Sequence, residues 1–220
     1  MRLVLLGPPG AGKGSLASLY HHRLGMAHLS TGEIFRKEIA RNSPLGRRVR
    51  RFVTNGRLVP DALVVEVMAG HLKRAASRGF VLDGFPRTAG QAKGLDRVMT
   101  RLGKALDAAV YLTSPESLLV RRLSGRLVCS RCGQNYHVRT MRPRLVGICD
   151  RCRGKLMTRK DDQPRTIAKR LKIDHKESSP LIDYYRAQSL LHCVNGAGRV
   201  DTVYQRTLKL FKRQGWLHRS

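Results

Sequence analysis

The 220-residue sequence has few acidic residues, few aromatic residues and no long apolar run. No stretch approaches the roughly 18 consecutive apolar residues that a membrane-spanning helix requires, so we expect a soluble protein. The first residues, MRLVLLG, lack the charged start, long apolar stretch and small-residue cleavage site of a signal peptide. The sequence therefore predicts a cytoplasmic protein without a membrane partner, and its length suits one α/β core with a small inserted module.

Acidic residues are so few that the net charge reaches +28, with 15 Asp and Glu against 43 Lys and Arg. A chain this basic attracts polyanions, which include nucleic acids, acidic membrane surfaces and phosphorylated metabolites. The sign of the charge does not choose among them, and a basic surface that is merely solvated is an equal alternative. Non-specific binding of nucleic acid therefore stays one of the expectations.

Short apolar runs alternate with helix-length stretches along the chain. This alternation, with strands that are apolar on both faces, predicts a parallel sheet between two layers of helices. Strands are predicted at 3–6, 80–82, 108–112 and, more weakly, around Val200, with a short extra strand near 26–29. Helices are predicted at 15–24, 32–41, 61–78, 88–102, 115–123, 164–188 and 202–212. The expected fold class is α/β.

The stretch LLGPPGAGKGSL, residues 5–16, follows the first predicted strand and opens the first predicted helix. Its spacing from Gly7 to Lys13 fits G-x-x-x-x-G-K, in which glycines let successive backbone N–H groups surround a phosphate. The helix N-terminus adds a favourable dipole, and the lysine adds a positive charge. The usual Ser or Thr after the lysine is replaced by Gly14, and the hydroxyl follows at Ser15. We expect this segment to bind the phosphates of a nucleotide.

Two further segments offer cations close to predicted helix starts. In LSTGEIFR, Ser30 and Thr31 are expected to cap a helix ahead of Arg36, which can meet an anion there. In NGRLVPD, a turn places Arg57 before the next helix. A single such cation is more often a solvated surface charge, so the prediction of an anion site depends on the two cations occurring together.

The stretch LDGFPRTAGQ, residues 82–91, puts an acid and a cation at the end of a predicted strand. Asp83 closes the strand, and Arg87 follows four residues later. Ligands of open parallel sheets bind outside the carboxyl ends of the strands, so we expect both side chains near the phosphate-binding loop. The sequence thus predicts a second anion site beside the first.

Four of the five cysteines form two Cys-x2-Cys pairs, Cys129 with Cys132 and Cys149 with Cys152, separated by sixteen residues. This spacing is typical of a tetrahedral zinc site with four thiolates. Disulfide bonds are the alternative, and a reducing compartment disfavours them. A closed four-sulfur shell leaves no position for a reacting water, so the expected Zn²⁺ is structural. The fifth, Cys193, is expected to be a buried small apolar residue near the last strand.

Together these motifs resemble those of the nucleoside monophosphate kinases, and more specifically the adenylate kinase family with a long lid. GPPGAGKGS is similar to that family's variant loop, in which Gly-Lys-Gly-Thr is usual, and the resemblance runs from residue 1 to about 201. It implies a three-layer α/β P-loop fold with a five-stranded parallel sheet, an AMP-binding helical segment and an inserted zinc-ribbon-like lid. The implied domains are the core, residues 1–29, 60–125 and 164–220, the AMP-binding segment, residues 30–59, and the lid, residues 126–163.

The resemblance also implies binding roles for the residues that match the family's motifs. Asp83 is implied to orient Mg²⁺ through water, and Gln91 to read the edge of the AMP adenine. The residues implied for ATP are Gly10, Ala11, Gly12, Lys13, Gly14, Ser15, Arg126 and Tyr136. The residues implied for AMP are Thr31, Arg36, Arg57, Val59, Gly84, Phe85, Pro86, Arg87, Gln91, Arg159 and Arg170.

The implied reaction is reversible transfer of the γ-phosphoryl group from MgATP to AMP, which gives two ADP. The AMP phosphate is already largely dianionic near neutral pH, so no general base is needed, and alignment and charge neutralisation do the work. Arg126 is implied to lie along ATP, and Asp161 and Asp162 are expected to tether the arginines and hold the lid closed. The implied catalytic residues are Lys13, Arg87, Arg122, Arg159 and Arg170.

The protein is expected to be a monomer, and three alternatives for its function stay open. The family usually has Asp-Gly-Thr after its last strand, where this chain has Asp201-Thr202-Val203, so GTP or another triphosphate is an open donor. A zinc-ribbon P-loop protein that binds RNA or ribosomes would explain the charge. Against it, aromatic residues make up only 5%, and the cysteine segment offers just Tyr136 as a stacking platform. A small-molecule kinase with another acceptor is the third.

Overall fold

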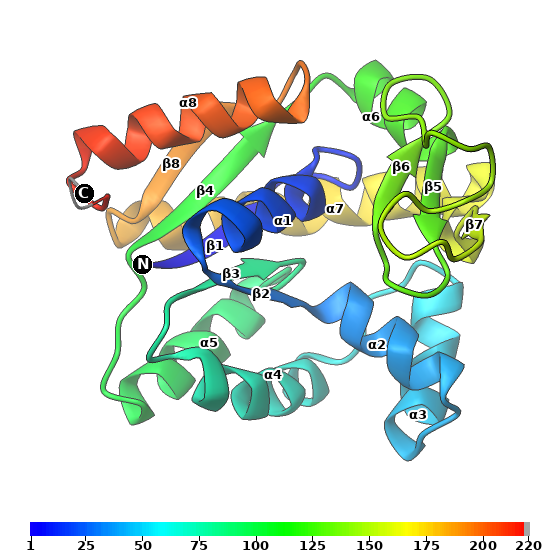
Figure 1. Ribbon diagram of the computed structural model, residues 1–220. Helices are drawn as coiled ribbons and strands as arrows, with labels where there is room; N and C mark the ends of the chain where they lie inside the picture. Colours follow the sequence, from blue (N-terminus) through cyan, green and yellow to red (C-terminus); the bar gives the residue numbers. More distant parts are fainter. Residues whose placement is uncertain (218–220) are drawn as a thin grey trace.

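A computed structural model describes residues 1–217 of the chain (Figure 1). At its centre, five parallel strands lie in the order β2-β3-β1-β4-β8. In register, Leu3 of β1 lies opposite Val81 of β3 and Ala108 of β4. The strands are β1 Arg2–Leu6, β2 Ala27–Ser30, β3 Phe80–Asp83, β4 Ala108–Thr113 and β8 Leu191–Asn195. The α/β class with a five-stranded parallel sheet is confirmed.

Helices cover both faces of this sheet, as its continuously apolar strands require. One buried cluster joins the sheet to α1 and α8, and the other joins it to α4, α5 and α7 (Figure 1). Leu3 and Leu5 of β1 enter the first cluster and Val4 and Leu6 the second, because successive side chains of a strand point to opposite faces. The helices are α1 Lys13–Leu24, α4 Asp61–Ala75, α5 Ala89–Arg101, α7 Pro164–Ala187 and α8 Val200–Arg213.

Two more helices, α2 Thr31–Ala40 and α3 Pro44–Thr54, extend from the β2 edge of the sheet (Figure 1). The sequence analysis predicts α2 and misses α3. Ser43 begins α3, since its Oγ accepts the N–H of Gly46 at 3.0 Å, and Pro44 occupies the first turn. The apolar side of α3, which includes Val49, was present in the sequence at helical spacing but was obscured by four intervening arginines.

The cysteine-rich segment forms a separate three-stranded antiparallel sheet, ordered β6-β5-β7, after α6 Glu116–Ser124. Its strands are β5 Arg126–Cys129, β6 Asn135–His137 and β7 Leu156–Met157, and a short 3₁₀ turn, η1 Lys160–Asp162, leads into α7. We call residues 126–163 the inserted lobe. In Figure 1 the inserted lobe lies at the right of the molecule, in front of the first part of α7 and above α3.

Two predictions near the carboxyl end are wrong. The last strand is Leu191–Asn195, and Val200 begins α8 instead of forming a strand. Cys193 is exposed, because β8 lies at the edge of the described sheet and has β4 as its one strand partner within residues 1–217. The edge position also explains the error, since a strand with one neighbour needs fewer apolar residues than the central strands.

No helix within residues 1–217 is both long and apolar enough to cross a bilayer.

Candidate active site

The phosphate-binding loop connects β1 to α1 at the carboxyl edge of the sheet. Gly12 caps α1 with a φ of 99°, and Gly10 has a φ of 86°, both in the left-handed region that side chains disfavour. A Cβ at Gly10 would also lie 2.9 Å from the carbonyl oxygen of Leu119. The glycines are therefore required by the backbone path, and they leave the loop lining a cavity of about 840 Å³.

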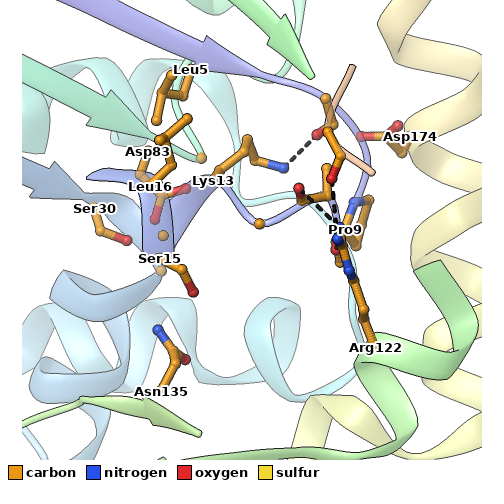
Figure 2. Close-up of a pocket in the computed structure, with 18 of the residues that line it drawn as sticks. Leu5, Pro9, Lys13, Ser15, Leu16, Ser30, Asp83, Arg122, Asn135 and Asp174 are labelled. Atoms are coloured by element: carbon orange, nitrogen blue, oxygen red, sulfur yellow. Dashed lines mark hydrogen bonds between the residues drawn. The ribbon is translucent and has the colours of Figure 1, made fainter. Parts of the chain in front are cut away.

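Lys13 folds back over the loop, where its Nζ donates to the carbonyl oxygens of Gly7 and of Pro8, the latter at 3.0 Å (Figure 2). Burial lowers the pKa of Lys13 to about 8, although the carboxylates of Asp174 and Asp83 favour the charged form. The ammonium group is thus held at the loop by main-chain oxygens and has no carboxylate within ion-pair distance among the described residues.

Arg122 fastens the same loop from the other side (Figure 2). Its Nη1 donates to the carbonyl oxygens of Gly10 at 3.4 Å and Ala11 at 3.3 Å. Its Nη2 donates to the carbonyl oxygens of Gly196 at 3.1 Å and Gly198 at 2.8 Å. The contacts of Arg122 are therefore those of a brace between the first loop and the loop after β8, and its expected role at the transferring group stays a prediction.

Asp83 lies at the end of β3, beside the phosphate-binding loop (Figure 2). Burial would raise its pKa, but the His28 imidazole, 3.5 Å away, and the charge of Lys13 lower the pKa to about 2. A Cβ at Gly14 would lie 3.1 Å from Asp83 Oδ2, so the missing side chain at residue 14 lets the carboxylate approach the loop. An ionised carboxylate next to bound triphosphate fits Mg²⁺, which prefers oxygen ligands and retains water.

The inserted lobe and α7 meet at two acids. Asp162, whose side chain is 0% exposed, accepts the Nε–H of Arg126 at 2.7 Å and an Nη1–H of Arg170 at 3.0 Å. Asp161 Oδ2 forms an ion pair with the same Arg170 Nη1 at 3.0 Å, and the main-chain oxygen of Asp161 accepts a hydrogen bond from that nitrogen at 3.0 Å. The expectation that Asp161 and Asp162 tether arginines agrees with these contacts.

Arg159 and Arg36 lie in the same cavity, and neither forms an ion pair within residues 1–217. Arg159 Nη2 donates to the side-chain oxygen of Asn135 at 3.0 Å, but its buried Nε has no hydrogen-bond partner in the described part of the chain. Burial, reinforced by the charges of Arg36 and Arg126, lowers the pKa of Arg159 to about 9. Crowded guanidinium groups with an unused buried donor form a site that an anion would stabilise.

The segment after β3 forms the second side of the cavity. Thr31 Oγ1 donates to the carbonyl oxygen of Gly84 at 2.8 Å, and Arg87 Nε donates to the same oxygen at 3.0 Å. Ser30 alone caps α2, so the expectation that Thr31 also caps it is wrong. Gln91 Nε2 donates to Asp61 Oδ1 at 2.8 Å, and its Oε1 accepts the N–H of Arg87 at 2.8 Å. One N–H of the amide of Gln91 stays available to a ligand.

Nearly all of the residues implied for ATP, AMP, catalysis and Mg²⁺ line this one cavity. Phe85 does not line it, because its side chain is fully buried in the cluster beneath the sheet, so any AMP contact there is confined to the main chain. Tyr136 lines the cavity, but its ring packs among the lobe's buried residues. The lining residues named earlier are Gly10, Ala11, Gly12, Lys13, Gly14, Ser15, Thr31, Arg36, Arg57, Val59, Asp83, Gly84, Pro86, Arg87, Gln91, Arg122, Arg126, Tyr136, Arg159 and Arg170.

The four cysteines of the two pairs meet in the inserted lobe, with their Sγ atoms all within 4.8 Å of one another, and all are free of disulfide bonds. Burial opposes ionisation of Cys149, but hydrogen bonds from Tyr136 Oη and from main-chain N–H groups lower its pKa to about 6. Tyr136 Oη also accepts the N–H of Asp150 at 2.8 Å. Four converging thiol groups, one already poised as thiolate, fit a tetrahedral zinc ion.

The structure adds residues that the sequence analysis did not select. His28 and Asn135 contact Asp83 and Arg159 as described, and Asp174 of α7 lines the cavity. Correcting the last strand also changes the segment that follows it. That segment is Asn195-Gly196-Ala197, directly after β8, whereas Asp201 lies in the first turn of α8, and both Gly196 and Asp201 line the cavity. The family's Asp-Gly-Thr therefore corresponds to Asn195-Gly196-Ala197, and its comparison with Asp201-Thr202-Val203 was wrong.

Comparisons with known proteins agree with this arrangement. The model of the family described as adenylate kinase matches residues 5–190. An adenylate kinase of Clostridium botulinum (strain 657 / Type Ba4) is 42% identical over 205 residues, which cover 93% of this chain and 95% of the relative. An adenylate kinase of Caldicellulosiruptor bescii is 40% identical over 210 residues, which cover 95% and 98%. From the loop, the cavity and these relatives together, the chain belongs to the adenylate kinase family of phosphotransferases.

Proposed function

We propose that the protein transfers the γ-phosphoryl group of MgATP to AMP reversibly, giving two ADP. The observation that carries this proposal is the single cavity in which the phosphate-binding loop faces cations from several distant segments. Arg36, Arg57 and Arg87 line it, and none of them is within ion-pair distance of an acid in residues 1–217. Cations that the protein leaves unneutralised favour two phosphorylated ligands.

The chain's own groups then act by alignment and charge. The loop's N–H groups and Lys13 hold the donor phosphates, while Arg87 and Arg170 close on the moving phosphoryl group. Arg122 keeps the loop in shape through its four carbonyl contacts. Asp83 would hold Mg²⁺ through water, and this ion neutralises charge on the phosphate oxygens. No general base is required, because the acceptor phosphate is already ionised.

We assign AMP to the side of the cavity formed by residues 30–59 and the turn after β3, and ATP to the side of the inserted lobe. Gly196, which follows the last strand and lines the cavity, is the main-chain position for the donor base. The inserted lobe closes over ATP and excludes water, which would otherwise accept the phosphoryl group. Zn²⁺ bound to Cys129, Cys132, Cys149 and Cys152 stabilises the fold of the lobe and takes no part in the reaction.

A coupled assay of ADP formation tests the proposal. We expect ATP plus AMP to be the fastest combination when a panel of nucleoside monophosphates is offered with ATP or GTP. Faster turnover with GTP would assign a different donor, and faster turnover with another acceptor would assign a different substrate. Activation of ATP hydrolysis by RNA without ADP formation from AMP would favour the RNA-binding alternative and contradict the kinase.

Substitution of the arginines tests their roles. We expect Arg87→Ala and Arg170→Ala each to lower kcat by at least about a hundredfold, as the loss of a preorganised charge does. Arg186→Ala is the matched control, since Arg186 lies on the same helix as Arg170 and forms an exposed pair with Asp183. Near-normal kcat in either cavity variant would contradict the assigned role.

The protein is proposed to act as a cytoplasmic monomer. Its positive charge is expected to retain RNA at low salt. Release of that RNA at high salt would show that the binding is non-specific.

A further inference from the structure

Asp174 is an acidic residue that lines the cavity proposed to bind phosphates. It lies on α7 four residues after Arg170, so both side chains share one face of the helix. That face lines the cavity, and Figure 2 shows the Asp174 side chain on the cavity side of α7, opposite the phosphate-binding loop. Lys13 and Arg87 line the same cavity, and Tyr111 of β4 also lines it.

Asp174 differs from three acids of this site that contact a basic side chain. Asp83 lies beside His28, and Asp161 and Asp162 form ion pairs with arginines. Within residues 1–217, Asp174 forms neither an ion pair nor a side-chain hydrogen bond. Among the described residues it is therefore a carboxylate without a hydrogen-bond or ion-pair partner.

The surroundings of Asp174 combine burial with positive charge at a distance. Burial raises its pKa, while Lys13, Arg87, Arg170 and the neighbouring His175 oppose that rise. Asp174 is in turn the acid that most strongly favours the charged form of Lys13. Its charge thus acts on the cations proposed to hold phosphate.

Such a carboxylate must affect nucleotide binding. A bound phosphate brings negative charge toward the same cations, and like charges in a partly buried site repel. ATP plus AMP carries the same total charge as two ADP, so this repulsion weakens binding on both sides of the reaction without favouring either. A residue with that effect raises the dissociation rate of product as well as that of substrate.

Building on the proposed function, we propose that Asp174 is a resident counter-charge of the phosphoryl site: it shares the cavity with Lys13 and Arg87, lies beside Arg170 on α7, weakens the binding of phosphorylated ligands and speeds product release. Asp174 is a positioning residue in this scheme, since it acts through the cations and not on the reacting atoms.

Asp174 also has an effect that favours phosphate binding, and this effect determines the pH of the test. Its removal also withdraws support from the charge of Lys13, whose pKa is about 8 with Asp174 present. Measurement at about pH 6.5 keeps Lys13 protonated, so the loss of repulsion dominates there. Near pH 9 the gain in affinity is expected to shrink, because Lys13 loses its proton more readily without the carboxylate.

The experiment is titration calorimetry of the intact, metal-loaded protein with ATP, ADP and a diadenosine compound bridged by five phosphates. We expect Asp174→Asn to tighten binding of each ligand roughly tenfold at about pH 6.5 and low salt. KM should fall by a similar factor, and kcat should fall less or not at all. Asp174→Glu, which retains the charge, should restore weaker binding.

Asp183→Asn is the matched control, because Asp183 carries the same charge on the same helix but is 60% exposed and paired with Arg186. It should leave affinity unchanged. If Asp174→Asn fails to fold, Asp174→Ala makes the same test of charge removal.

Unchanged or weaker binding in the folded Asp174 variants overturns the inference and leaves the proposed kinase intact, since a merely structural aspartate cannot tighten binding when it is lost. Failure of the wild-type protein to bind the bridged compound overturns both proposals.

Discussion

The two sheets of this protein are stabilised in different ways. The five-stranded sheet lies between two large buried clusters, and side chains such as Phe80 and Leu82 are fully buried. The three-stranded sheet has a buried cluster of only Cys129, Tyr136, Cys149 and Leu156, two of which are thiols. Apolar burial suffices for the first, whereas a lobe this small needs another source of stability. We expect the cysteine cluster, once it holds a metal ion, to stabilise the lobe in place of a larger hydrophobic core.

Removal of the proposed zinc tests most directly whether the two sheets are stabilised differently, and it has the largest expected effect. Structural zinc contributes on the order of 10 kcal/mol to small metal-dependent domains, so a chelator should unfold the inserted lobe while the five-stranded sheet persists. Hydrogen exchange should show rapid exchange confined to the lobe, and phosphoryl transfer should stop because Arg126 and Arg159 lose their positions.

Two controls sharpen this test. Cys149→Ser should reproduce the effect of the chelator, whereas Cys193→Ser should not, since Cys193 is exposed and outside the cluster. We expect about one zinc per chain by metal analysis. A metal-free protein with a fully protected lobe would show that the cluster does not hold the lobe together.

The corresponding test of the large sheet is Phe80→Ala. Loss of a fully buried Phe side chain costs about 3–5 kcal/mol, so the midpoint of urea unfolding should fall for the whole core. Phe80→Leu, which leaves less empty volume, should cost less. The zinc content of the folded fraction should stay the same, and loss of zinc in parallel would mean that the two sheets do not fold independently.

The third test addresses the junction between the sheets. Asp162→Asn leaves Arg126 without its charge partner in a buried site, and breaking such a pair costs about 3 kcal/mol. We expect faster hydrogen exchange at η1 and the start of α7, together with a lower kcat. Asp183→Asn breaks an exposed pair on the same helix and should change unfolding by less than about 1 kcal/mol. If the two variants changed the free energy of unfolding equally, the buried pair at the junction would be no more important than an exposed one.

The smallest effect is expected within the lobe from Tyr136→Phe. The variant loses the hydroxyl group that bonds to Cys149 Sγ and to the Asp150 N–H, a loss of about 1 kcal/mol. The pKa of Cys149 should rise from about 6, so zinc should be released at a higher pH than in the wild-type protein. An acid titration with a zinc-sensitive dye measures this, and release at an unchanged pH would show that Tyr136 does not tune the thiolate.

The sequence predicted those features that depend on local spacing. The phosphate-binding loop, the strand ending at Asp83 and the two cysteine pairs are each complete within a short segment, and the structure has them where expected. The parallel arrangement of the core strands followed from their apolar character, whereas their order was not predicted. β8 was missed because an edge strand that contains His192 and an exposed Cys193 lacks that character.

Features that depend on long-range contact could not be predicted. The partners of Arg122 lie 74 to 112 residues away, and no pattern in the sequence announces them. Asp174 follows Arg170 in an ordinary helical stretch, so only the fold shows that it lines the cavity. Tyr136 was assigned by resemblance alone, and its hydroxyl contacts with the cysteine cluster required the packed lobe.

The brace formed by Arg122 also has a consequence for the order of folding. The phosphate-binding loop follows the first strand of the five-stranded sheet, whereas Gly196 and Gly198, which hold the other half of the Arg122 guanidinium group, follow the last. A folding intermediate in which β8 has not yet joined the sheet has the loop without half of its brace. We therefore expect the loop to reach its final shape only when the last strand docks.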